Sequence, residues 1–242
     1  MTLPGFQPDW PAPASVRAWV TTREGGFSQG AYQSFNLAAH VEDDLLAVEA
    51  NRQLLREQLG IRPAWLQQVH GIEVACADPA AVPVADASWS DQPGVACAIL
   101  TAACLPALFC DRTGRRVAAA HAGWRGLVPG VLEATLASLQ CPPEEALVWL
   151  GPAIGPQAFE VGPEVREAFV VAQPEADAAF VASVREGHFY ADLYELARLR
   201  LRRAGVREIH GGGFCTYSDP RFYSYRRNAR TGRFASLIWI AE

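Results

Sequence analysis

The sequence contains no lysine, because all 21 of its Lys and Arg residues are arginines. This absence excludes a lysine nucleophile, a lysine Schiff base and the lysine of a phosphate-binding P-loop. Any phosphate or carboxylate ligand would therefore be held by guanidinium groups or by backbone amides.

Other expected features are also missing. The six cysteines form no CxxC pair, which argues against a zinc ribbon or a disulfide framework. The first fifteen residues lack the basic start and apolar run of a signal peptide. We therefore expect a cytoplasmic protein with reduced thiols. The net charge of −5 argues against nucleic-acid and anionic-membrane partners, and nothing in the sequence implies a protein partner.

One stretch, residues 92–110, carries no charge and is long enough to imitate a membrane span. Pro93 and Pro106 interrupt it, and no second span accompanies it. We favour two buried strands that are separated near Cys104.

The pattern of apolar residues predicts a single domain over residues 1–242, with mixed β-sheets and helices outside them. No GxGxxG follows the first strand, which argues against a Rossmann fold. The predicted helices are 44–59, 164–172 and 192–204, with a further one after residue 126. The predicted strands and extended segments are 16–21, 65–75, 95–102, 105–110, 117–120, 146–150, 222–226 and 234–240.

His121 is the most informative candidate for chemistry, because a strand of small residues delivers it to a glycine-containing loop before a helix. Cys104 lies where a buried strand breaks, and a neighbouring imidazole could activate its thiol. A Cys–His pair can be a nucleophilic dyad, or, with a second imidazole such as His70, an open zinc site. Each residue alone is also compatible with a structural role. We interpret the other cysteines as packing residues: Cys76, Cys97, Cys110, Cys141 and Cys215.

Three arginine positions suggest an anion site. Arg23 lies in a glycine-rich loop, Arg125 follows His121 by four residues, and Arg226 lies in an arginine pair. The alternative for Arg226 is a solvated hairpin face.

Several segments together resemble, over nearly the whole chain, the YfiH family, whose members are also called laccase-domain proteins and peptidoglycan-editing factors. The matching segments are TTREGGFS (21–28), NLAAHV (36–41), WLQQVHG (65–71), ADAS (85–88), LTAACLP (100–106), VAAAHAGWRGL (117–127), WLGPAIGPQAFEVG (149–162) and FYSYRRNARTGRFASLIW (222–239).

The resemblance implies an α+β fold, a layered sandwich of mixed β-sheets flanked by helices. It also implies a Zn²⁺ ion, with Cu²⁺ as an alternative, held by His70, Cys104 and His121, which would also carry catalysis. Arg23, Asn36, Arg125 and Arg226 become the expected substrate-binding residues. The family's ascribed activities are phosphorolysis of adenosine, inosine and methylthioadenosine, adenosine deamination, and editing of the first amino acid of peptidoglycan precursors. The expected partner is accordingly a small molecule, either a purine nucleoside with phosphate or a muramyl precursor.

The sequence departs from the family pattern at one position. The residue before the cysteine is typically Asp in the family, and here it is Ala103. A methyl group can neither shuttle a proton nor orient an imidazole, although Asp86 could substitute. Three hypotheses stay open: a zinc-dependent purine nucleoside phosphorylase with adenosine deaminase activity, a Cys–His amidase, and a weak polyphenol oxidase or inactive metal-binding module. A multicopper oxidase would need more imidazoles than five histidines supply.

Overall fold

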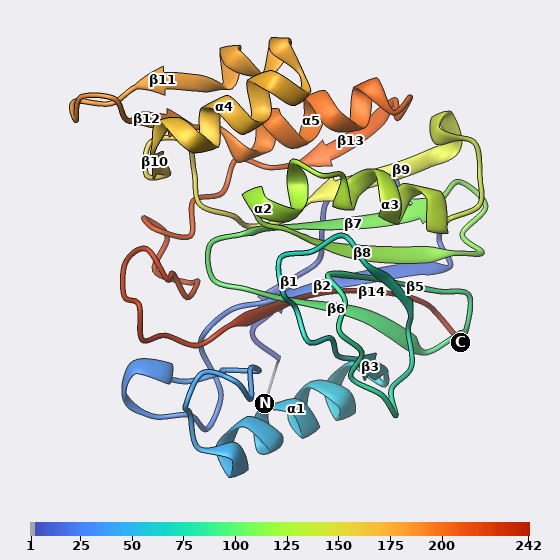
Figure 1. Ribbon diagram of the computed structural model, residues 1–242. Coiled ribbons are helices and arrows are strands. Elements are labelled where there is room, and N and C mark those ends of the chain that lie inside the picture. Colours follow the sequence, from blue (N-terminus) through green and yellow to red (C-terminus); the bar gives the residue numbers. More distant parts are fainter. Residues whose placement is uncertain (1–2) are drawn as a thin grey trace.

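The computed structural model describes residues 3–242 and has a layered architecture in which two β-sheets face each other (Figure 1). The five-stranded sheet has the order β1 (Gly5–Phe6), β2 (Val16–Thr21), β14 (Phe234–Ile240), β6 (Val95–Thr101) and β3 (Arg62–Ala64). The six-stranded sheet has the order β13 (Glu208–Gly211), β9 (Ala146–Leu150), β7 (Leu105–Asp111), β8 (Val117–Ala122), β5 (Ala87–Ser90) and β4 (Val74–Cys76). Both sheets mix parallel and antiparallel pairs, as the sequence predicts.

Helices cover the outer face of each sheet (Figure 1). Helix α1 (Leu45–Leu59) lies under the five-stranded sheet, with the Asp44 carboxylate accepting a hydrogen bond from the amide of Leu46 at its start. Gly60 ends the helix in the left-handed conformation that suits glycine. The opposite face carries α2 (Trp124–Leu127), α3 (Val131–Ser138), α4 (Pro163–Ala172) and α5 (Leu193–Arg203).

The alternation of side chains along the strands divides the core into three layers. Leu108 and Cys110 of β7 face the inter-sheet core, whereas Ala107 and Phe109 face the helices. In β14, Ile238 packs between the sheets and Leu237 packs towards α1. The prediction that both faces of the last strand are covered is therefore confirmed.

The uncharged stretch forms β6 and β7, so the two-strand interpretation is confirmed. Within the described residues, no helix is both long and apolar enough to cross a membrane.

Two segments predicted to be extended are not strands. Residues 222–226 contain a bend and the start of a turn, and most of residues 65–75 is irregular between β3 and β4. A third, three-stranded sheet was missed altogether: β10 (Glu160–Val161), β12 (Phe189–Ala191) and β11 (Phe180–Ala182). Its strands are two or three residues long, too short to show a period of two.

Candidate metal centre

Three chain segments meet at one edge of the sandwich. Cys104 lies in the short connection that carries the chain from β6 in one sheet to β7 in the other. His121 lies near the end of β8, paired with Pro106 of the adjacent strand. His70 lies in the loop between β3 and β4. The fold therefore brings together residues that no local motif connects.

The donor atoms of His70, Cys104 and His121 all lie within 4.8 Å of one another. The distance from Cys104 Sγ to His70 Nε2 is 3.8 Å, and the two imidazole centroids are 4.7 Å apart with their planes inclined at 67°. Tetrahedral zinc with ordinary Zn–S and Zn–N bond lengths would separate sulfur and nitrogen ligands by about 3.6 Å. The donor set and its spacing thus fit a three-ligand zinc site, and a copper ion accepts the same ligands.

Asp86 holds two of the candidate ligands in place through hydrogen bonds. Its side chain is fully buried, and Oδ1 lies 2.8 Å from Nδ1 of His121. That contact leaves Nε2 of His121 as the nitrogen available to a metal, which is the usual carboxylate–histidine–metal arrangement.

The same carboxylate also fixes the loop that carries His70. Its two oxygens accept hydrogen bonds from the consecutive amides of Val69, His70 and Gly71, at 3.0, 2.9 and 2.6 Å. His70 has a φ of 63°, an unfavourable conformation for a residue with a Cβ. Asp86 therefore stabilises a strained loop as well as an imidazole. From the sequence, Asp86 was expected only as a possible substitute for the acid that Ala103 replaces.

Gly123 of the HAGWRG segment lies directly against the ligands. A Cβ at this position would lie 2.8 Å from Cδ2 of His70 and 3.0 Å from Sγ of Cys104. Any larger residue would displace one of the ligands, which explains why the loop after β8 contains glycine here.

The electrostatics favour a deprotonated thiol. Burial alone would raise the pKa of Cys104, but the imidazoles of His121 and His70 outweigh it and lower that pKa to about 6. Burial would likewise lower the pKa of His121, but Cys104 and Asp86 raise it to about 9. A thiolate is the form of cysteine that binds metals and attacks electrophiles.

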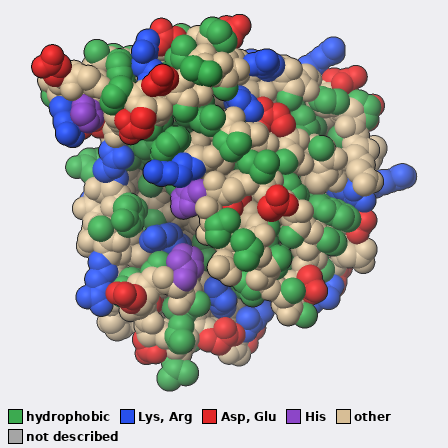
Figure 2. Space-filling view, viewed as in Figure 1, with side chains coloured by type: hydrophobic (Ala, Val, Ile, Leu, Met, Phe, Trp, Pro, Cys, Tyr) green, Lys and Arg blue, Asp and Glu red, His purple; other side chains and the backbone are tan. Residues whose placement is uncertain are grey.

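The three residues line a cavity of about 340 Å³, within the size range of small-molecule sites. On the face shown in Figure 2, histidine side chains lie in the left half of the molecule, with arginine side chains beside them. The other lining residues are His40, Gln68, Leu100, Thr101, Ala102, Ala103, Tyr225 and Arg233. Ala103 thus presents a methyl group to the cavity beside the thiol.

The four residues expected to bind substrate do not line this cavity. Arg23 donates to the carbonyl of Gln33 and borders another pocket, and the exposed Arg125 lies over the ring of Trp124. Arg226 donates to the carbonyl of Glu160. Asn36 is fully buried, and its Oδ1 accepts a hydrogen bond from the amide of Arg233 at 2.8 Å.

Sequence analysis missed Thr101 and Arg233 as cavity residues. Both lie inside segments that it did single out, LTAACLP and FYSYRRNARTGRFASLIW. Their proximity to Cys104 becomes evident only when β6 and β14 are paired, with Phe234 opposite Thr101.

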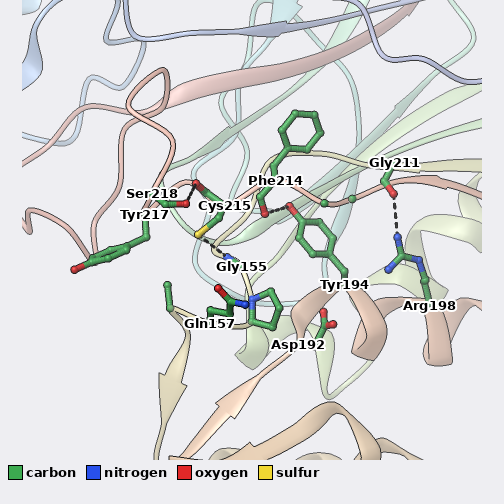
Figure 3. Close-up of a pocket in the computed structure, with 14 residues that line it drawn as sticks. Gly155, Gln157, Asp192, Tyr194, Arg198, Gly211, Phe214, Cys215, Tyr217 and Ser218 are labelled. Carbon is green, nitrogen blue, oxygen red and sulfur yellow. Dashed lines mark hydrogen bonds between the residues drawn. The ribbon is translucent and has the colours of Figure 1, made fainter.

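A larger cavity of about 730 Å³ lies elsewhere, between the 155–158 loop, α5 and the 211–218 loop (Figure 3). Cys215 lines it, and its Sγ accepts a hydrogen bond from the amide of Gly155 at 3.2 Å. Burial would raise the pKa of Cys215, but hydrogen bonds from Ser218, Gly155 and Tyr217 lower it. Cys215 thus lies in a cavity wall; of the other cysteines interpreted as packing residues, Cys97 and Cys110 are buried, whereas Cys76 is exposed. This cavity contains none of the metal-ligand candidates.

Comparison with known proteins gives consistent matches over almost the whole chain. A family model described as multi-copper polyphenol oxidoreductase laccase matches residues 17–241. A purine nucleoside phosphorylase from Pseudomonas aeruginosa is 67% identical, covering 97% of this chain and 98% of the relative. The purine nucleoside phosphorylase YfiH from Escherichia coli is 52% identical, covering 96% and 97%.

Solved structures share the same architecture. The crystal structure of a Neisseria meningitidis protein matches with a TM-score of 0.95 at 52% identity, over 98% of this chain and 99% of that one. The structure of YlmD from Geobacillus stearothermophilus matches with a TM-score of 0.92 at 30% identity, over 100% and 98%. The predicted layered α+β fold is thereby confirmed.

Proposed function

Because this chain belongs to the multi-copper polyphenol oxidoreductase laccase family, which includes the YfiH proteins, we propose that it is a purine nucleoside phosphorylase with zinc at the His70–Cys104–His121 centre. The single observation that carries the proposal is this three-ligand cluster in a cavity of small-molecule size, in a chain 67% identical to a protein of that name. The proposed substrates are adenosine, inosine and methylthioadenosine, with copper as the alternative metal.

Each residue of the site has a separate role in the proposed reaction. His70, Cys104 and His121 would hold the zinc, which when bound supplies a Lewis acid with an open coordination position. The Asp86 carboxylate accepts a hydrogen bond from Nδ1 of His121, and this leaves Nε2 free for the metal. The cavity walls bind and orient the nucleoside, and they exclude water from the anomeric carbon.

Phosphorolysis forms a bond between a phosphate oxygen and the anomeric carbon while the bond from that carbon to the purine nitrogen breaks. The electron pair of the broken bond passes to the purine, which then needs a proton. Ala103 offers none. Of the cavity residues that would not be metal ligands, His40 and Tyr225 carry a transferable proton, and we assign them as candidates for this step.

Adenosine deamination is included as a secondary activity, and Ala103 affects it most. Deaminases need an acid next to the metal to shuttle protons, and the cavity has no carboxylate among its lining residues. We therefore expect phosphorolysis to exceed deamination.

The deciding experiment incubates zinc-loaded protein with inosine and inorganic phosphate. Phosphorolysis predicts equal amounts of hypoxanthine and ribose 1-phosphate, none without phosphate, and none from a Cys104→Ala variant. Adenosine in place of inosine would report deamination through ammonia release. An absence of ribose 1-phosphate above the variant's background would refute the proposal.

A second candidate function, a Cys–His amidase acting on a muramyl precursor, is favoured by one specific observation. The Cys104 thiol, the His121 imidazole and the Asp86 carboxylate follow one another in the order of a nucleophile, a base and an orienting acid. The two functions respond oppositely to zinc, since the amidase needs a free thiolate. Amide cleavage that appears on metal removal, with a thioester on Cys104 by mass spectrometry, would replace the phosphorylase proposal.

Oxidase chemistry has weaker support. Within residues 3–242 the cluster of His70, Cys104 and His121 is the only group of three or more His, Cys, Asp or Glu ligands close enough for a metal. A multicopper oxidase needs additional histidine ligands for its further copper ions. We therefore propose at most a slow polyphenol oxidation when copper is bound.

A further inference from the structure

Arg233 is the principal cationic side chain in the wall of the metal cavity. Its Nη1 donates hydrogen bonds to the carbonyls of Thr231 and Gly232, at 2.8 and 3.0 Å. Its own amide is fixed by Asn36. The guanidinium is therefore held at one nitrogen by a rigid loop at the start of β14.

The rest of this guanidinium makes no hydrogen bond to the protein, and its Cζ lies 5.9 Å from the ring centroid of Tyr225. A guanidinium group has five N–H donors, of which Nη1 supplies two. In the described part of the chain, no hydrogen bond involves Nε or Nη2 of Arg233, and no carboxylate lies within ion-pair distance. Three donors of a half-buried cation are therefore available to a ligand.

Thr101 supplies a second and independent sign of a ligand. Its side chain is 2% exposed and lines the same cavity, yet Oγ1 has no hydrogen-bond partner among residues 3–242. Buried hydroxyl groups are almost always paired, so an unpaired one on a residue of the cavity wall marks a place where a ligand or water belongs.

The charge around these two groups is net positive once a divalent metal is bound. Arg233 lines the cavity, and no aspartate or glutamate does. The nearest acid of the metal centre, Asp86, is fully buried, and its oxygens are occupied by His121 and three backbone amides. The Cys104 thiolate contributes a negative charge to the wall, and a divalent metal would outweigh it, so the metal-loaded cavity favours an anion.

We propose that Arg233 and Thr101 form an oxyanion subsite beside the metal centre, and that this subsite takes the phosphate that attacks the nucleoside. The inference rests on the proposed function for the identity of the anion. It moves the phosphate site away from Arg23 and Arg125, which border other surfaces. Guanidinium donors match phosphate oxygens, and the threonine hydroxyl donates to a further one.

The subsite has a definite role in the reaction. Phosphate bound there would be oriented towards the anomeric carbon while Arg233 compensates its charge. No bond to the protein forms or breaks, so Arg233 and Thr101 act only by binding.

The test measures binding of inorganic phosphate to zinc-loaded protein by ³¹P NMR titration, and the KM for phosphate in parallel. Arg233→Gln should weaken phosphate binding about tenfold or more, and the nearly isosteric Thr101→Val about threefold. Arg230→Gln is the matched control, because Arg230 lies on the same loop, is exposed and contacts Tyr32 rather than the cavity. Its phosphate affinity should equal that of wild type.

Thr101→Val keeps the proposal testable if Arg233→Gln does not fold, and thermal melting identifies that case. Phosphate binding unchanged in both variants would overturn the subsite, as would stronger binding of acetate than of phosphate. Phosphate binding that depends on Arg233 in a protein that makes no ribose 1-phosphate would retain the subsite and refute the phosphorylase. If Arg233→Gln forms ribose 1-phosphate with an unaltered KM for phosphate, the phosphorylase proposal stands and the subsite is refuted.

Discussion

The most informative single substitution is Asp86→Asn, because this one carboxylate supports both histidines of the metal centre. Oδ1 contacts the His70 amide and Nδ1 of His121, and Oδ2 accepts from the amides of Val69 and Gly71. An asparagine has only one acceptor oxygen in the same shape. If the amide nitrogen takes the place of Oδ2, the amides of Val69 and Gly71 lose their acceptor. If it takes the place of Oδ1, the His70 amide loses its acceptor and His121 must move its proton from Nδ1 to Nε2, the nitrogen that would bind the metal.

The structure sets the size of the effect. These backbone donors are only partly buried, so each one left without a partner costs about 1–2 kcal/mol, and the free energy of unfolding should fall by about 1–4 kcal/mol. A domain of ordinary stability, about 5–15 kcal/mol, survives that loss. Removal of a carboxylate that orients a metal-bound histidine typically lowers metal affinity 10–100-fold, which is about 1.4–2.8 kcal/mol.

The assay is a competition titration of zinc against a chromophoric chelator, with urea unfolding of the metal-free proteins in parallel. Asp78→Asn is the control, because Asp78 is exposed and accepts from the amide of Ala80. That control should leave the zinc affinity and the unfolding free energy unchanged. A folded Asp86→Asn protein with wild-type zinc affinity would refute the role assigned to this carboxylate.

Three further predictions concern the same site. Ala103→Asp should raise the kcat of phosphorolysis about 100-fold by supplying a proton donor at the cavity wall, and steady-state turnover equal to wild type would contradict this. Gly123→Ala should lower zinc affinity about tenfold or more, because the added methyl group would press against His70 and Cys104 while the φ of −65° at this position accommodates alanine. Competition with a chelator measures the affinity, and an unchanged value would show that the methyl group does not displace the ligands. In metal-free protein, the rate at which iodoacetamide alkylates Cys104 should rise through about pH 6 and then level, because the thiolate predominates above the pKa of about 6. For an ordinary thiol, whose pKa is 9.0, the same rise would come near pH 9. Peptide mass mapping should find Cys97 unmodified, since burial raises its pKa to about 12, and faster labelling of Cys97 than of Cys104 would contradict the order.

Much of the layered fold could be predicted because its signals are local. The uncharged residues of β6 and β7, the apolar stripe of α1 between Asp44 and Gly60, and the two-sided burial of β14 can all be recognised in short windows. The three-stranded sheet could not, because its strands are too short for periodicity and form only by packing beside α4 and α5.

The three candidate metal ligands could be named from family motifs, whereas the residues around them could not. Asp86, Thr101 and Arg233 come from different sheets and loops, and only strand pairing and loop hydrogen bonds bring them to one cavity. An arginine in sequence looks the same whether its guanidinium is solvated, as in Arg230, or faces a buried thiol, as in Arg233. That difference is a property of tertiary packing.

We propose above all that His70, Cys104 and His121 together bind one metal ion. Elemental analysis of purified wild-type protein beside Cys104→Ala decides whether they do. We expect about one zinc per chain in the wild type and little or none in the variant, with both proteins folded by circular dichroism. A wild-type protein that cannot be loaded with zinc or copper, or a variant that retains the full metal content, would show that these three residues do not form a metal site.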